Sequence, residues 1–286
     1  MKITKKSTAL IMLLGLIGLI GIDIQSISAA SLTAFEIIQK VDDRDDGDAF
    51  ISDMIMVKID KKKQQRKLEL RTYSKDYGKD TKSIIFFLSP ADKRNVSFLS
   101  WDKDKDEDED DKWLYLPAGN VKTRISGGKK KDPFMGSDFS YADMESIEIN
   151  DWNYKFVTKY REKDKKSLNP VVAGHDCWII QATPKKSKLK KVLKEIGYTK
   201  RVLWVRKDNF MLVKGRIWVK KGKKTKMFFA RKINKLQGIW RSDELEMRTY
   251  KGKRLEHRTL LLFTKTDYKV TIDDSMFTEQ RMMRGL

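Results

Sequence analysis

The chain contains 286 residues, 40% of them hydrophobic and 35% charged, and this composition excludes both a disordered chain and one buried in a bilayer. Its 61 lysines and arginines outnumber its 40 aspartates and glutamates and give a net charge of +21, which favours contact with anionic surfaces. A single cysteine, Cys177, excludes an intramolecular disulfide, and with only two histidines we expect no metal site and no cofactor.

The first thirty residues have the pattern of a secretory leader. Three early lysines precede an apolar run from Ala9 to Ile22, and Ser28-Ala29-Ala30 supplies small residues for cleavage after Ala30. The run has fourteen positions, fewer than the roughly 20 that a spanning helix needs, so a membrane anchor is the weaker alternative. We therefore predict a cleaved signal peptide over residues 1–30, one mature domain over residues 31–286 and a periplasmic location.

Beyond the leader, one short helix is followed by many strands. Leu32–Val41 has helical spacing of its apolar residues, with Ser31 or Thr33 as candidate N-caps. Further short helices are expected at Tyr141–Ile147, Lys188–Ile196 and Asp274–Met283. Alternation with a period of two and intervening turn residues predict strands at Ile51–Ile59, Lys67–Tyr73, Ser83–Leu88, Val96–Trp101, Lys112–Leu116, Tyr154–Tyr160, Cys177–Thr183, Arg201–Arg206, Phe210–Lys220, Lys226–Ile233, Gly238–Arg248 and Arg258–Lys265. The short turns from about residue 200 onward indicate an antiparallel meander.

An acidic segment, Asp102–Asp111, lies between two of these strands and holds eight carboxylates and two lysines. Its D-x-D-x-D start is similar to a calcium loop, but the expected sixth-position glycine is Glu107 and the expected twelfth-position glutamate is Trp113. We therefore expect a solvated loop of mutually repelling charges, with weak cation binding as the alternative.

The segment Lys185–Ile196 predicts a basic amphipathic helix, because Leu189, Val192, Leu193 and Ile196 follow helical spacing and lysines occupy most other positions. Such a helix either packs its apolar side on the sheet or docks on an anionic bilayer. The other basic residues are spread over most strands, and no nucleic-acid motif of defined spacing occurs. We expect transient contact with a membrane surface and no nucleic-acid partner.

Several predicted strands are apolar on both faces, whereas a sheet with one wet face should alternate cleanly. In Ser83–Leu88, for example, Ile84 and Phe86 point one way and Ile85 and Phe87 the other. The few short helices cannot cover both faces of about a dozen strands. The second face therefore needs a second sheet or a hydrophobic ligand held in a curved, partly open sheet.

A resemblance to a known family is carried by Lys112-Trp113-Leu114-Tyr115-Leu116-Pro117 and by Phe134-Met135-Gly136-Ser137-Asp138-Phe139-Ser140-Tyr141-Ala142-Asp143. These segments resemble the W-x-Y-x-P and F-x-G-S-D-F-S-Y-x-D signature of the outer-membrane lipoprotein-sorting (LolA-like) proteins, and especially the branch associated with RND-type exporters. Further matches include His175-Asp176-Cys177-Trp178 and Val202–Phe210, so that the similarity extends over about residues 32–285.

The resemblance implies a mainly β fold: a strongly curved, incompletely closed antiparallel sheet, or half-barrel, with short helices on its concave side. It also implies a periplasmic carrier of acyl chains of lipids or lipoproteins, with no catalytic residues and with an inner-membrane RND-type exporter as a candidate partner. Which face of the sheet is concave cannot be read from the sequence. Candidate lining residues are Ile55, Val57, Ile59, Phe86, Trp113, Tyr115, Val202, Trp204, Phe228 and Leu261; the signature residues expected to shape the cavity rim are Trp113, Tyr115, Pro117, Phe134, Gly136, Ser137, Asp138, Phe139 and Asp143.

The signature also has a physical interpretation of its own. Gly136 permits a backbone conformation or a close approach that a Cβ would block, and Ser140 with Asp143 has the spacing of a capping box. Ser137 as a nucleophile would need a histidine base, and neither histidine has a sequence context that ties it to Ser137. Likewise, His175 and Cys177 are more simply a histidine with satisfied hydrogen bonds beside a buried thiol than a reactive pair.

Two alternatives from other functional classes stay open. An envelope-stress sensor or regulator could use the same fold to bind lipid and a membrane partner. An envelope hydrolase would need a convergent nucleophile and base or a defined carboxylate pair, neither of which the sequence shows.

Overall fold

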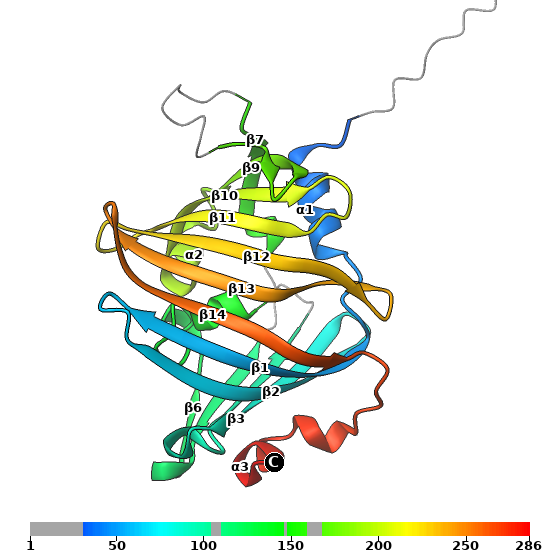
Figure 1. The fold of residues 1–286 in the computed structure, drawn as a ribbon, viewed down its shortest axis with the longest axis vertical. Coiled ribbons are helices and arrows are strands. Elements are labelled where there is room, and N and C mark those ends of the chain that lie inside the picture. Colours follow the sequence, from blue (N-terminus) through cyan, green and yellow to red (C-terminus); the bar gives the residue numbers. More distant parts are fainter. Residues whose placement is uncertain (1–30, 104–109, 146–147, 159–167) are drawn as a thin grey trace, which may run out of the picture. The chain divides into compact units, whose positions relative to one another are not determined.

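One antiparallel sheet organises residues Leu32–Leu286, which form one compact unit of the computed structural model (Figure 1). The structure describes residues 31–286 apart from 104–109, 146–147 and 159–167. The predicted leader, most of the acidic segment and the ends of two predicted elements, Tyr141–Ile147 and Tyr154–Tyr160, lie outside the described residues. The leader therefore stays a prediction.

The strands follow the predicted succession with two short additions, Val121–Arg124 and Val171–Val172, and most of the predicted strands are longer than expected. The first six are β1 (Ala49–Asp60), β2 (Gln65–Tyr77), β3 (Asp80–Ser89), β4 (Ser97–Asp102), β5 (Asp111–Leu116) and β6 (Val121–Arg124). The others are β7 (Trp152–Phe156), β8 (Val171–Val172), β9 (His175–Pro184), β10 (Tyr198–Arg206), β11 (Leu212–Val219), β12 (Lys224–Leu236), β13 (Ile239–Lys251) and β14 (Arg254–Asp267).

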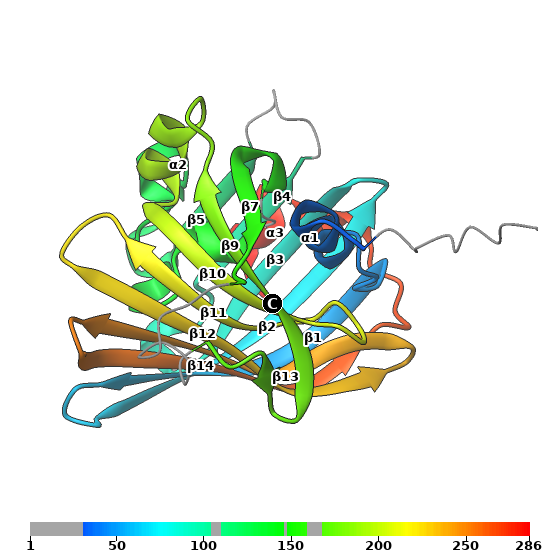
Figure 2. The same cartoon turned by 90° about the horizontal axis from the view of Figure 1, so that it is seen from above.

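The strand order shows two meanders joined at the middle of the sheet. The order is β6-β5-β4-β3-β2-β1-β14-β13-β12-β11-β10-β9-β7, with β8 paired only to β9. The first and last strands of the long succession, β1 and β14, therefore pair with each other, whereas β6 and β7 form opposite edges. As predicted, the fold is mainly β, and its sheet is strongly curved and not closed (Figure 2).

Two of the helices lie on the concave face. α1 (Ala34–Asp42) begins with a capping box, in which the Thr33 hydroxyl accepts from the Glu36 amide at 3.2 Å and the Glu36 carboxylate accepts from the Thr33 amide at 2.7 Å. α2 (Leu189–Glu195) buries Val192 against the concave core. Neither they nor any other helix in the described ranges is long and apolar enough to cross a bilayer.

The third helix departs from the prediction that the helices lie on the concave side. α3 (Glu279–Arg284) and the preceding turn of 3-10 helix (Asp274–Phe277) pack on the convex face of β2–β5. There Phe277 and Met282 bury Ile84, Phe86 and other apolar side chains of that face. The chain's own C-terminal segment therefore covers part of the second apolar face that the sequence analysis left open.

The concave face is crossed by the connection from β6 to β7, because these strands lie at opposite edges of the sheet. This connection, described over residues 125–145 and 148–151, buries aromatic rings of the signature in the hollow. The ring of Phe134 lies 5.5 Å from that of Phe98 and 5.4 Å from that of Tyr141, and the ring of Phe139 is also buried. The connection therefore acts as a strap that fills the centre of the trough.

A buried ion cluster fixes the start of β5 beneath this strap. Lys112 is fully buried, and its ammonium lies 2.5 Å from Asp102, 2.7 Å from Asp110 and 3.3 Å from Glu145. Burial alone would lower the pKa of Lys112, but the three carboxylates raise it above its ordinary value, so that Lys112 stays charged. Both ends of the acidic segment are thus engaged in ion pairs.

Candidate functional site

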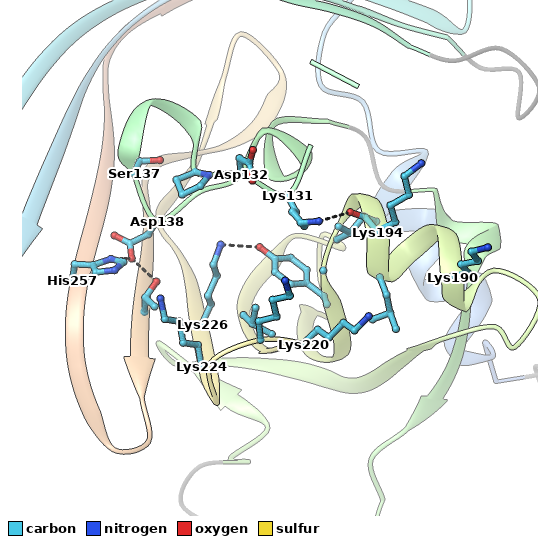
Figure 3. Close-up of a pocket in the computed structure, with 18 residues that line it drawn as sticks. Lys131, Asp132, Ser137, Asp138, Lys190, Lys194, Lys220, Lys224, Lys226 and His257 are labelled. Carbon is cyan, nitrogen blue, oxygen red and sulfur yellow. Dashed lines mark hydrogen bonds and ion pairs between the residues drawn. The ribbon is translucent and has the colours of Figure 1, made fainter. Parts of the chain in front are cut away.

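A cavity of about 640 Å³ remains on the concave face between α2, the strap and the ends of β11–β14 (Figure 3). Its size is within the range of ligand-binding pockets. The lining residues are Lys131, Asp132, Pro133, Ser137 and Asp138 of the strap, Lys190, Leu193, Lys194 and Ile196 at α2, Gly197 and Tyr198 leading into β10, Val219, Lys220, Lys221, Lys224 and Lys226 around the β11–β12 turn, and Thr249 and His257 of β13 and β14.

The wall beside α2 and β10 is apolar in part. Leu193 and Ile196 lie three positions apart and face the cavity together, and Val219 continues this surface from β11. Tyr198 is almost fully buried, and its hydroxyl donates to Asp143 at 2.7 Å. Burial, followed by the proximity of Asp143, raises the pKa of Tyr198 well above its ordinary value, so this hydroxyl stays a neutral donor.

Asp138 holds the strap to the sheet at the opposite wall. The residue is 3% exposed, and its carboxylate accepts from the hydroxyls of Thr249 at 2.5 Å and Thr259 at 2.8 Å. His257 Nδ1 also contacts the carboxylate, and the Asp138 amide donates to the Thr259 hydroxyl at 3.0 Å. The signature thereby fixes one wall of the cavity to β13 and β14, as Figure 3 shows for Asp138 and His257.

A second hollow of about 310 Å³ continues along the same strands. Phe228, Ala230, Leu245 and Phe263 line it from the concave face. Phe228 lies two residues beyond Lys226 on the same face of β12, so the two spaces are neighbours. We call the cavity of about 640 Å³ the lysine-lined cavity and the second one the aromatic hollow. Apolar surface on the concave face therefore extends from the edge of the lysine-lined cavity into the aromatic hollow.

Comparisons with known proteins agree with this geometry. A protein-family model with the description "Uncharacterized protein" matches residues 79–284, more than half of the chain. The crystal structure of a DUF1329 family protein from Desulfovibrio piger is similar at 28% identity and a TM-score of 0.73, covering 87% of this chain and 97% of that one. A domain from Vibrio parahaemolyticus, described as an outer membrane lipoprotein-sorting protein, is similar at 25% identity and a TM-score of 0.73, covering 88% of this chain and 98% of that one.

The chain belongs to the protein family that this model describes, and the solved structures that it resembles have the LolA-like fold. A LolA superfamily protein from Nitrosomonas europaea has the same fold at 17% identity and a TM-score of 0.63, covering 88% of this chain and all of that one. No curated protein matches the sequence significantly.

The register of this LolA-like sheet separates the ten candidate lining residues into two sets. Phe228 and Leu261 lie on the concave face, where Leu261 pairs with Met56 and Phe228 borders the aromatic hollow. The other candidates share the convex face: Ile55, Val57, Ile59, Phe86, Trp113, Tyr115, Val202 and Trp204. The structure therefore does not bring the ten residues together.

The signature residues of the LolA-like pattern also occupy different places. Ser137 and Asp138 line the lysine-lined cavity; Phe134 and Phe139 are buried in the concave core, and Asp143 caps the turn at Ser140 through two hydrogen bonds of 2.8 Å. Gly136 has a φ of +69°, and a Cβ at this position would meet the Lys58 ammonium at an ordinary contact distance of 3.6 Å, so the backbone conformation rather than a close approach requires glycine. The signature proline and the two aromatic residues of β5 lie elsewhere: Pro117 follows β5, and Trp113 and Tyr115 face the convex side.

The contacts of Ser137 and Cys177 are structural. The Ser137 hydroxyl donates to the Phe139 carbonyl at 3.1 Å and accepts from the Phe139 amide, whereas His257 contacts Asp138. The Cys177 thiol is buried and donates to the main-chain carbonyl of His175 at 3.6 Å. Within the described residues, no group of three or more His, Cys, Asp or Glu side chains could hold a metal ion.

Sequence reasoning missed the lysines that surround the cavity from two turns. The sequence analysis considered the lysines of α2 for membrane docking. It did not consider Lys131, which follows Gly127-Gly128, or the lysines of the β11–β12 turn, whose sequence is Lys220-Lys221-Gly222-Lys223-Lys224. The lysine- and glycine-rich sequences of these two turns could have indicated a basic site. The sequence does not show that both turns line the same cavity as α2.

Proposed function

We propose that this protein is a periplasmic carrier that binds the acyl chains of lipids or lipoproteins in the concave-face cavity and moves them between membranes without catalysing a reaction. The observation that carries the proposal is the cavity of about 640 Å³ with the apolar wall of Leu193, Ile196 and Val219, which persists although the strap and the C-terminal segment cover much of both sheet faces. An acyl chain is the ligand that such a wall favours, because its binding removes apolar surface from water.

The family supports the same proposal. The Vibrio parahaemolyticus domain with the same fold is described as a lipoprotein-sorting protein, and the present chain covers 98% of it. Transient contact with a membrane surface and an inner-membrane RND-type exporter as partner are parts of this proposal.

Lipid mass spectrometry after organic extraction of the purified protein tests the proposal. We expect a bound species with at least one acyl chain in near-stoichiometric amount. Leu193→Trp and Val219→Trp should each fill the cavity and lower the bound amount severalfold. Val171→Trp is the matched control, because Val171 is exposed on β8 and does not line the cavity.

Two results would overturn the carrier proposal. One is a protein without extractable lipid that also fails to take up an added acyl-chain probe. The other is co-purification of a stoichiometric protein partner in place of lipid, the behaviour expected of a sensor or regulator.

A further inference from the structure

The lining of the lysine-lined cavity carries far more positive than negative charge. Seven lysines line it, namely Lys131, Lys190, Lys194, Lys220, Lys221, Lys224 and Lys226. Among the described lining residues, only Asp132 and Asp138 carry carboxylates. Lysines from the strap, α2 and β12 face the same space in Figure 3. The cavity therefore concentrates positive charge from three parts of the chain that are distant in sequence.

The two carboxylates leave most of this charge uncompensated. Asp138 is almost fully buried, and its oxygens are already occupied by two threonine hydroxyls and His257. Asp132 is exposed and forms no ion pair within the described ranges. The lining thus supplies one unpaired carboxylate, that of Asp132, against the seven ammonium ions.

Two of the seven lysines are held by the protein. The Lys226 ammonium donates to the Tyr198 hydroxyl at 3.0 Å and lies 3.5 Å from Asp143. The Lys131 ammonium donates to the Lys194 carbonyl at 3.2 Å. For the remaining five, Lys190, Lys194, Lys220, Lys221 and Lys224, the described part of the chain contains no side-chain ion pair.

Clustered ammonium ions repel one another, and a bound anion removes this cost. Lysine binds phosphate as a point charge with three rotatable donors, so several lysines on flexible stems can adapt to one phosphate group. A purely ionic ligand would leave the neighbouring wall of Leu193, Ile196 and Val219 exposed to water. An amphiphile satisfies both surfaces, with its anionic group among the lysines and its chain against the wall.

We propose that the lysine-lined cavity selects anionic phospholipids, with the phosphate-bearing head group held by the lysines of α2 and of the β11–β12 turn. The inference rests on the proposed carrier function and names its ligand class. The acyl chain lies along Leu193, Ile196 and Val219 and points toward the aromatic hollow that begins at Phe228. Neutral lipids of the same chain length bind less tightly, because they leave the lysines unpaired.

The test compares three probes that differ by one part each. Lysophosphatidic acid with a palmitoyl chain carries chain and phosphate, monopalmitoylglycerol carries the chain alone, and glycerol 3-phosphate carries the phosphate alone. Calorimetric titration of the full chain, below the micelle concentration of each probe, should show lysophosphatidic acid binding at least about tenfold more tightly than monopalmitoylglycerol. Glycerol 3-phosphate should bind most weakly, because it gains nothing from the apolar wall.

A charge-matched pair of variants assigns the preference to the cavity. The cavity variant carries Lys220→Gln, Lys221→Gln and Lys224→Gln, three exposed lysines whose loss breaks no ion pair in the described structure. The control variant carries Lys207→Gln, Lys265→Gln and Lys269→Gln, which are equally exposed and line none of the cavities described above. The cavity variant should lose about tenfold in affinity for lysophosphatidic acid and keep its affinity for monopalmitoylglycerol. The control variant should match the unmodified protein for both probes.

The outcomes separate the two proposals. Equal affinity for the two acyl probes, or equal losses in the two variants, would overturn the head-group inference and leave the carrier proposal standing. Glycerol 3-phosphate that binds as tightly as lysophosphatidic acid would assign the lysines to free phosphate and likewise overturn the lipid inference. Failure of both acyl probes to bind would contradict the carrier proposal itself.

Discussion

At the scale of single residues, Asp138 joins two parts of the chain that are more than 100 positions apart in sequence. Its carboxylate accepts from Thr249 and Thr259, which lie 111 and 121 residues further along the chain. A buried carboxylate is costly unless its oxygens are hydrogen-bonded, and here the two hydroxyls and His257 provide those bonds. The side chain therefore determines where the strap lies on β13 and β14.

We predict that Asp138→Ala lowers the free energy of unfolding by about 3 kcal/mol, because it leaves two buried hydroxyls without their acceptor. Urea unfolding at neutral pH measures this. Asp176→Ala removes an exposed carboxylate and should change the unfolding free energy by less than about 0.5 kcal/mol. Equal losses in the two variants would contradict the anchoring role of Asp138.

Cys177 offers a prediction about reactivity. The thiol is 3% exposed, and burial raises its pKa to about 11. Since the thiolate is the reactive form, native-state labelling by a maleimide should be slow at pH 8 and should rise about tenfold per pH unit up to about pH 11. In denaturant the rate at pH 8 should increase at least about 100-fold and level off above pH 9. Fast native labelling that levels off near neutral pH would instead indicate an activated thiol.

At the scale of elements, the sequence predicts the strands better than it predicts what covers them. The alternation in β3 identifies Phe86 and Phe87 as apolar on opposite faces, and the structure confirms this. The two rings cannot be assigned to the convex or concave side from the sequence, because their covers come from distant segments. Phe277, for example, accepts a hydrogen bond from Trp101, 176 residues away. For the same reason, the sequence could not show that most of the ten candidate lining residues lie on the convex face.

The C-terminal segment should contribute strongly to stability. Phe277 is 1% exposed on the convex core, and Phe277→Ala should cost about 3 to 5 kcal/mol, since it leaves a cavity beside Tyr77 and neighbouring aromatic rings. Met283, in the same segment, is 42% exposed, so Met283→Ala should cost less than about 0.5 kcal/mol. Thermal unfolding of both variants distinguishes a packed cover from a loosely attached tail, for which the two losses would be alike.

At the scale of the whole molecule, the net charge of +21 should govern encounters with membranes. Binding to vesicles that contain phosphatidylglycerol should weaken at least about tenfold between 0.05 and 0.5 M salt, because the Debye length falls from about 14 to about 4 Å. Phosphatidylcholine vesicles serve as the control and should bind weakly at both salt concentrations. Co-sedimentation measures both; binding that does not respond to salt would show that charge does not drive the encounter.

The pairing of β1 with β14 also affects the stage of folding at which the concave-face cavity can form. Ser52 and Thr266 share a hydrogen bond of 2.6 Å across this ladder, although 214 positions separate them in sequence. Such distant pairings form late, because closing a long loop costs entropy before any contact repays it. Before β14 has been synthesised, β1–β6 can form only part of the sheet, in which the edge of β1 that later pairs with β14 is unpaired. Because Thr249 and His257 of the last two strands contribute to the lining of the cavity, that lining is complete only after β14 has been synthesised.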